Sequence, residues 1–184
     1  SVPWTRGYGL AQQQANTGLF SVGRIAERES LFQWVGPFVS SQNRFYTLKG
    51  SPLKINSLAD ARQHKLVMPR LWYSVQYLQS QGFDDIYTVT SPEIMMNMFR
   101  NGRSDLLAAS DVTLPNVLAL ADLTPADVVP QFSFMEHSSY LVFSPATNPQ
   151  VALRWQKALE QLRRDGTVAR LQSRWLGHIK PRQR

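Results

Sequence analysis

The sequence contains no cysteine and only three histidines. The lack of cysteine excludes disulfides, thiolate metal sites and a cysteine nucleophile, and it is compatible with an oxidising or a reducing compartment. The histidines, His64, His137 and His178, are dispersed and have no metal-ligand spacing. The sequence therefore predicts no metal site and no cofactor.

Long apolar runs are also missing. No stretch approaches the roughly 20 residues of a membrane span, and the first residues, SVPWTRGYG, have no signal-like apolar core. We expect a soluble chain whose targeting segment has been removed or was never present. With 184 residues, 43% of them apolar and 11% aromatic, the chain is long enough to bury a core as one large domain or two small lobes.

Patterns of common enzymes are absent as well. There is no nucleophile elbow and no phosphate-binding loop, and the neighbouring acids Glu27 and Glu29, or Asp84 and Asp85, are typical of solvated loops. The sequence thus predicts no catalytic residue and no enzyme.

Positive charge is what the chain has in excess, with 20 Lys and Arg against 13 Asp and Glu, so that 20 − 13 = +7. Such a balance favours acidic partners, including nucleic acid, anionic lipid and carboxylate ligands, without choosing among them. The basic residues do not gather on one predicted face with interleaved aromatic residues, so we predict no nucleic-acid partner. The basic tail, residues 177–184, is expected to be frayed.

Helix and strand signals alternate along the chain. Ser91 and Asn148 are predicted N-caps because each precedes a proline in the first helical position. Further helices are expected at 4–15 and 72–80. After a break at Asp165 and Gly166, a last helix near the C-terminus should carry an apolar stripe of Val168, Leu171 and Trp175. Short apolar strands are predicted at 19–22, 44–48, 65–68, 86–89, 106–109 and 140–143. This alternation predicts an α/β fold with mostly parallel sheets flanked by helices.

Four segments together carry a resemblance to a known family. They are PWTRGYGLAQQQANTGLFSVGRIAERESLFQWVGPF, KINSLAD, FRNGRSDLLAASD and ALEQLRRDGTVARLQSRWL, in this order and spacing. The chain resembles the family 3 extracellular solute-binding proteins of bacterial ABC uptake systems, of the amino-acid type, from about Pro3 to Leu176. The resemblance implies a two-lobed, periplasmic binding protein-like fold of type II.

The same resemblance implies a division of the chain. Lobe 1 would comprise residues 1–42 plus 141–184 and lobe 2 residues 49–135, with crossing strands near 43–48 and 139–144. Members of the family begin with a strand, a helix and a second strand that this chain lacks, so lobe 1 is expected to be incomplete at its N-terminus. Either the sequence is a fragment, or it is a natural short form whose exposed sheet edge is covered, for example by a second copy in a homodimer.

Two arginines follow the strand predicted at 19–22. Ligands of open α/β sheets bind outside the carboxyl ends of strands, and the planar guanidinium of arginine suits a carboxylate. By resemblance, Arg28 clamps the carboxylate of the solute, and Ser21 and Gly23 contribute a hydroxyl and backbone amides. Arg24 either contacts a second acidic group of the solute or forms a surface pair with Glu27 or Glu29.

Lobe 2 supplies the other candidate contacts, which are Arg70, Trp72, Tyr73, Ser110 and Asp111. The first three join a strand to a helix whose N-terminus favours an anion, and Trp72 has an alternative place in the helix core. By resemblance, Asp111 meets a ligand ammonium. Ser110 or Asp111 is also predicted as the N-cap of the following helix, a role that does not exclude a ligand contact, while Asp105, which begins the strand, is expected to be structural.

These expectations describe a periplasmic protein that captures a small polar or carboxylate-bearing solute between its lobes and presents it to the membrane permease of an ABC transporter. The alternative is a sensor or partner-binding module of the same fold that takes no part in transport. A solute whose binding is lost when Arg28 is replaced by Ala would favour the first interpretation.

Overall fold

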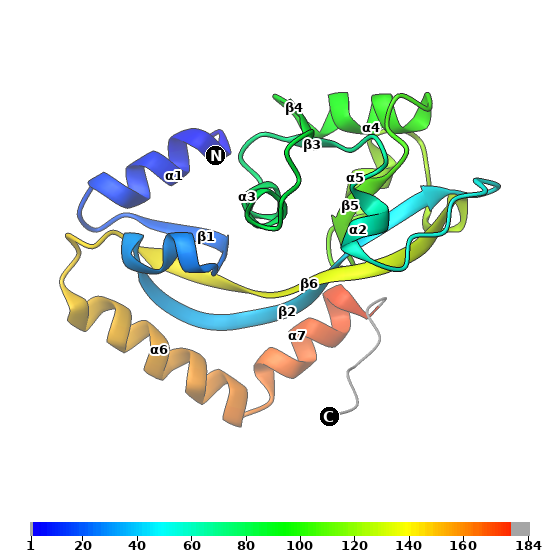
Figure 1. The fold of residues 1–184 in the computed structure, drawn as a ribbon. Coiled ribbons are helices and arrows are strands. Elements are labelled where there is room, and N and C mark those ends of the chain that lie inside the picture. The colour runs from blue at the N-terminus through cyan, green and yellow to red at the C-terminus, as the bar shows by residue number, and fades with distance from the viewer. Residues whose placement is uncertain (1, 178–184) are drawn as a thin grey trace. The chain divides into compact units, whose positions relative to one another are not determined.

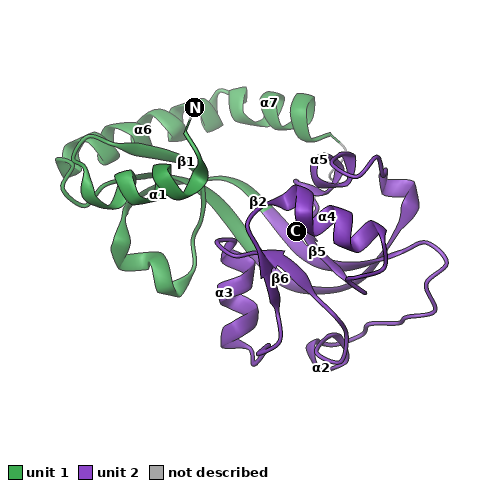
Figure 2. Cartoon of the chain, turned by 90° about the horizontal axis from the view of Figure 1, so that it is seen from above, with its two compact units in different colours: residues 1–40, 137–184 green, residues 41–136 purple. Residues whose placement is uncertain are grey.

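A computed structural model describes residues 2–177, so the predicted frayed tail lies largely outside the described residues. The chain forms two compact units, unit 1 with Ser1–Ser40 and His137–Arg184, and unit 2 with Ser41–Glu136 (Figure 2). Both boundaries fall inside strands. The division into two functional lobes, which the resemblance implies, stays a prediction.

The elements alternate as predicted and confirm the α/β class (Figure 1). Unit 1 contains α1 (Trp4–Gln13), β1 (Gly18–Gly23), the 3-10 helix η1 (Ala26–Leu31), α6 (Pro149–Arg164) and α7 (Thr167–Leu176). Unit 2 contains α2 (Leu58–Ala61), β3 (Val67–Pro69), α3 (Tyr73–Ser80), β4 (Tyr87–Val89), α4 (Pro92–Arg100), β5 (Leu107–Ser110), α5 (Leu114–Ala119) and the 3-10 helix η2 (Pro125–Asp127). Strands β2 (Gln33–Leu48) and β6 (Val128–Phe143) belong to both units.

Unit 2 has three layers because its strands are apolar on both faces. Phe45, Leu106 and Ala108 join one buried cluster, which also takes in residues of α2 and α3. Their chain neighbours Tyr46 and Leu107 join a second cluster with residues of α4 and α5. Successive side chains of a strand point to opposite faces, so the sheet lies between the two helical layers.

Unit 1 repeats this plan on a smaller scale. Val142 packs in one cluster with Ala11 of α1, while its neighbours Leu141 and Phe143 pack with α6 through Leu159. Each of these helices therefore covers one face of the strand pair β1 and β6.

The strand pairing corrects the prediction of mostly parallel sheets. The structure pairs β1 with β6 and β2 with β5 in antiparallel fashion, while β3 and β4 are parallel. A helix between successive strands favours parallel neighbours, and this is the case for β3 and β4. By contrast, β1 and β2 pair with strands that are distant in the sequence, whose directions no single local connection determines.

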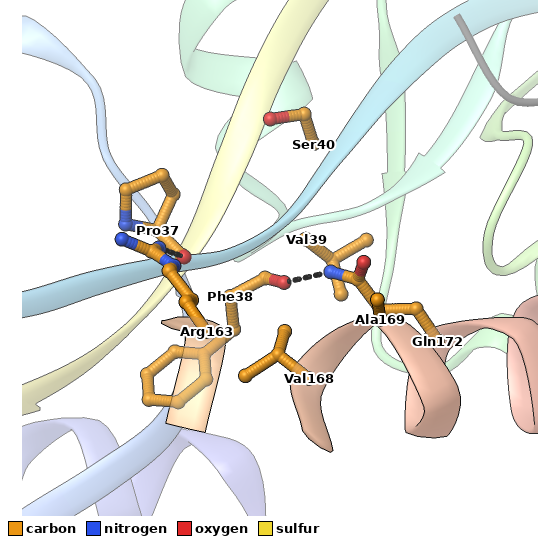
Figure 3. A pocket seen from close by; sticks show the side chains of 8 residues that line it. All are labelled: Pro37, Phe38, Val39, Ser40, Arg163, Val168, Ala169 and Gln172. Carbon is orange, nitrogen blue, oxygen red and sulfur yellow. Dashed lines mark hydrogen bonds between the residues drawn. The ribbon is translucent and has the colours of Figure 1, made fainter. Parts of the chain in front are cut away.

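The predicted apolar stripe of α7 does not become a buried face. Helix α7 has no fully buried residue, and Leu171 and Trp175 are 47% and 68% exposed. Part of the helix instead borders a hollow of about 470 Å³ beside β2, lined by Val168, Gln172 and other residues (Figure 3). Gln172 and Arg163 donate hydrogen bonds to backbone carbonyls of β2, so polar contacts hold the helices here.

Candidate functional site

The candidate segment of unit 1 begins at a bulge in β1. Phe20 pairs with Leu141 and Val22 with Tyr140, so that Ser21 is the extra residue between two ladder positions. A bulge redirects a side chain beside the regular ladder. Ser21 is exposed while Val22 is fully buried, and this leaves the Ser21 hydroxyl accessible at the end of a strand that the core fixes.

Arg28 is buried, with 3% of its surface exposed. It lies in η1, directly after β1 and Gly23, and its guanidinium carbon is 5.1 Å from the centre of the Tyr8 ring. The ring face of Tyr8 attracts the cation and covers it from solvent. Sequence reasoning missed Tyr8, because the pattern of α1 shows that a face is buried but not that an arginine packs on it. The role of Arg28 as a carboxylate clamp stays a prediction.

Arg24 is paired, as in one of the two alternatives. Its Nε donates to Glu29 Oε2 at 2.8 Å, and its Nη2 donates to Glu29 Oε1. The guanidinium carbon also lies 5.3 Å from the ring centre of Trp34 and 5.2 Å from that of Tyr140. The hydrogen bonds raise the pKa of Arg24 and lower the pKa of Glu29, so both groups stay charged.

In unit 2, the carboxyl ends of β3 and β5 carry the other candidate residues. Arg70 follows β3, is exposed, and donates its backbone N–H to Val89 at the end of β4 with an N···O distance of 2.9 Å. Trp72 is half-buried and packs against both apolar clusters of this unit. These contacts are the core role that the sequence analysis held as an alternative for Trp72.

Tyr73 and Asn43 form a polar contact beside these strand ends. The Tyr73 hydroxyl donates to Asn43 Oδ1 at 3.1 Å, and Asn43 is buried and paired in register with Ser110. Buried polar side chains are nearly always hydrogen-bonded, and this contact gives the Asn43 side-chain oxygen a donor. The sequence analysis missed Asn43, because a single asparagine in front of an apolar strand gives no sign of what it faces.

Ser110 and Asp111 do not cap the following helix, so the predicted N-cap role is wrong. Helix α5 begins at Leu114 with Thr113 as its N-cap residue, after a turn. Ser110 Oγ accepts the N–H of Thr113 at 3.1 Å, and Asp111 Oδ1 accepts the backbone N–H groups of Gln42 and Val112 at 3.1 and 2.9 Å. Their side chains therefore stabilise the turn that precedes α5, and Pro115 lies in the first turn of that helix, where proline is tolerated. A ligand ammonium at Asp111 stays a prediction.

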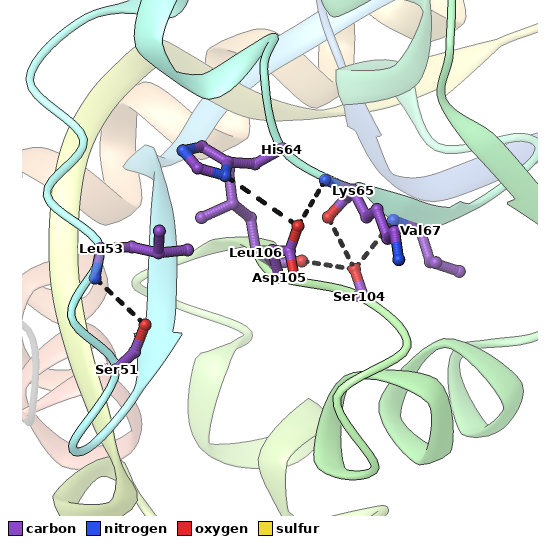
Figure 4. Close-up of polar contacts among 8 residues, drawn as sticks. All are labelled: Ser51, Leu53, His64, Lys65, Val67, Ser104, Asp105 and Leu106. Carbon is purple, nitrogen blue, oxygen red and sulfur yellow. Dashed lines mark hydrogen bonds and ion pairs between the residues drawn. The ribbon is translucent and has the colours of Figure 1, made fainter.

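The amino ends of the same strands are tied by a separate network (Figure 4). Asp105 Oδ2 accepts the N–H of Lys65 at 2.8 Å, and Ser104 Oγ accepts the N–H of Val67 at 3.1 Å. His64 Nδ1 lies 4.0 Å from Asp105 Oδ2, beside a hollow of about 120 Å³. These contacts give Asp105 the structural role expected of it. Among residues 2–177, no group of three acids or histidines is arranged to hold a metal ion.

The structure thus gathers the candidates in two sets. Ser21, Gly23, Arg24 and Arg28 lie in unit 1, and the remaining candidates lie in unit 2, namely Arg70, Trp72, Tyr73, Ser110 and Asp111. None of them lines either of the two hollows described above. The binding role of both sets stays a prediction. No helix within the described part of the chain is long and apolar enough to span a bilayer.

No family model and no curated protein matches the sequence, but solved structures share its fold. A histidine kinase sensor domain with similarity to periplasmic binding proteins matches with a TM-score of 0.83 and 18% identity, over 97% of this chain and 77% of that one. A putative binding component of an ABC transporter from Wolinella succinogenes, complexed with lysine, matches with a TM-score of 0.77 and 17% identity, over 95% and 76%. EhuB in complex with hydroxyectoine gives a TM-score of 0.77 and 16% identity, over 91% and 68%. The chain therefore has the periplasmic binding protein-like α/β fold predicted from its sequence.

Proposed function

We propose that this chain is a solute-binding protein that captures a small polar solute carrying a carboxylate, of the amino-acid class. The observation that carries the proposal is the buried guanidinium of Arg28, which follows the carboxyl end of β1 in a fold shared with solute-binding proteins. Away from bulk water, a carboxylate that reaches a guanidinium is attracted more strongly than on an exposed surface. The solved neighbours include proteins complexed with lysine and with hydroxyectoine, which supports the choice of solute class.

The proposed contacts in unit 1 follow from the chemistry of a carboxylate. The guanidinium of Arg28 offers two parallel N–H donors that match the two carboxylate oxygens, and it remains charged at any physiological pH. The exposed hydroxyl of Ser21 and the backbone N–H of Gly23 add neutral donors from the same strand end. Donors from three residues on one short segment suit a compact anionic group better than a sugar.

The proposed contacts in unit 2 suit the rest of a zwitterionic solute. Asp111 provides a carboxylate for an ammonium, and Tyr73 provides an aromatic face beside the strand ends. Ser110, at the end of β5, adds a hydroxyl, and the exposed Arg70 adds a charge that favours solutes with a further acidic group. Trp72 contributes apolar surface from its half-buried position at the start of α3.

Uptake is the proposed purpose of binding, with a location in the periplasm and the permease of an ABC transporter as the partner. Likeness to the binding component of an ABC transporter supports this role. A second candidate is a sensor module, which is supported by likeness to the histidine kinase sensor domain. Cells that lack the gene are expected to lose uptake of the labelled solute; a lost transcriptional response with unchanged uptake would favour the sensor.

Binding itself is tested by thermal-shift assays with amino acids, dicarboxylates, polyamines and sugars. A solute at 100 times its dissociation constant should stabilise the native state by about 2.7 kcal/mol, which raises the melting temperature clearly. The Arg28→Ala variant is expected to lose at least about tenfold in affinity for amino acids, because charge-assisted hydrogen bonds contribute roughly 1.5–3 kcal/mol. The matched control is Arg6→Ala, which removes an exposed arginine of α1 in the same unit and should bind normally.

The melting temperature without solute is recorded for each variant, so that loss of binding is separated from loss of folding. A panel in which no solute raises the melting temperature of the natural chain would refute the proposed function. Equal stabilisation of the natural chain and the Arg28→Ala variant would refute the role of Arg28 alone.

A further inference from the structure

The hydrogen-bonding fork of Arg24 is already engaged inside unit 1. Nε and Nη2 both donate to the carboxylate of Glu29, which makes a bidentate pair. The rings of Trp34 and Tyr140 lie 5.5 Å apart at 83° to each other, and the guanidinium carbon is within 5.3 Å of both ring centres. The cation is thus held in an aromatic corner with its charge matched by Glu29.

This arrangement joins the two ends of the segment that carries Arg28. Arg24 precedes η1 and Glu29 lies within it, so their pair closes a loop across Arg28. The loop is tied to the neighbouring strands as well. The indole N–H of Trp34 in β2 donates to the Glu29 carbonyl at 3.0 Å, and the backbone N–H of Arg24 donates to Ser138 in β6 at 3.4 Å.

We propose that Arg24 is a positioning residue, which acts through η1 on Arg28 and does not touch the solute. The inference rests on the proposed function of Arg28 and explains why two arginines stand four residues apart. A side chain that is ordered before binding has less conformational freedom to lose, so the pair between Arg24 and Glu29 strengthens solute binding by keeping Arg28 in place. Exposed ion pairs stabilise a folded segment only weakly, so we expect a modest loss of affinity and a small change in the melting temperature of the variants.

The direction in which one substitution changes the affinity for the solute distinguishes positioning from direct electrostatics. Glu29→Gln removes a negative charge near a proposed anion site, so direct electrostatics alone would tighten the binding of an amino acid. Positioning predicts weaker binding, by about three- to tenfold. Glu27→Gln is the matched control, because it removes the same charge from the same 3-10 helix without breaking the pair with Arg24. Isothermal titration calorimetry of both variants gives the comparison.

A second variant tests whether Arg24 contacts the solute. Arg24→Lys keeps the charge but loses the bidentate fork, so it should weaken binding about as much as Glu29→Gln. Positioning predicts the same fold loss for glutamate and for glutamine as solutes. A loss confined to glutamate would show a direct contact with a second carboxylate and overturn the proposal, as would tighter binding by Glu29→Gln.

Hydrogen exchange tests the loop without any solute. The backbone N–H of Arg28 donates to Ile25 at 3.0 Å, and its exchange should be faster in Glu29→Gln than in the natural chain or Glu27→Gln. Unchanged exchange would overturn the proposal even if solute binds. If no solute binds the natural chain, the proposed function fails, while faster exchange in Glu29→Gln would still establish that the pair orders η1.

Discussion

Stability should fall between pH 7 and pH 5 because of one buried histidine. His137 lies in β6 with 8% of its surface exposed, and burial lowers the pKa of its imidazole from 6.5 to about 4. The unfolded chain therefore binds the proton more tightly than the native state does. The contribution of His137 to the free energy of unfolding is fully present above the pKa of the unfolded chain, and it is lost as the pH falls towards the pKa of the folded chain. Between pH 7 and pH 5 these two values give a loss of about 2 kcal/mol in the free energy of unfolding.

Urea denaturation across this pH range measures the effect. Carboxylates with lowered pKa values, such as that of Glu29, titrate mainly below this range, so they add little to the slope. The His137→Gln variant, whose side chain stays neutral, should show a nearly flat profile whatever its absolute stability. His64→Gln is the control and should keep the slope, because it leaves His137 in place. A natural chain equally stable at both pH values would refute the assignment, as would an unchanged slope in His137→Gln.

Three further substitutions test the backbone and a helix end. Gly36 has φ of +152°, and an added Cβ would lie 2.6 Å from the Tyr140 ring, so Gly36→Ala should destabilise the chain by at least about 1 kcal/mol in urea denaturation. Gly9→Ala, in α1 with open space around it, should instead stabilise it by about 0.5–1 kcal/mol, and a loss of stability there would contradict the packing. Asn148 accepts the N–H of Gln150 at 2.9 Å as the N-cap of α6, so Asn148→Ala should lower the melting temperature through a loss of about 1 kcal/mol; an unchanged melting curve would contradict the cap.

The sequence predicted the short strands and most helices well because their signals are local. N-caps followed by proline predicted the starts of α4 and α6, and apolar runs predicted β3, β4 and β5. Of the long strands β2 and β6, the sequence predicted only the last residues, 44–48 and 140–143. Gly36, Pro37 and a run of polar residues interrupt the apolar pattern in the first part of β2. The strand continues through them because β6 is its neighbour in the sheet, and that neighbour lies about 100 residues further along the chain.

The candidate site shows the same limit at the level of single side chains. Both Arg24 and Arg28 follow a strand end, which is all that a sequence reveals about their surroundings. Their different environments arise from residues that the fold brings together. Tyr140, more than 100 residues away, helps to hold Arg24 against Glu29, while Tyr8 of α1 covers Arg28. The spacing of two arginines can therefore suggest a dicarboxylate, whereas their different neighbours favour different roles: Arg24 pairs with Glu29, and Arg28 is the arginine proposed to bind the solute.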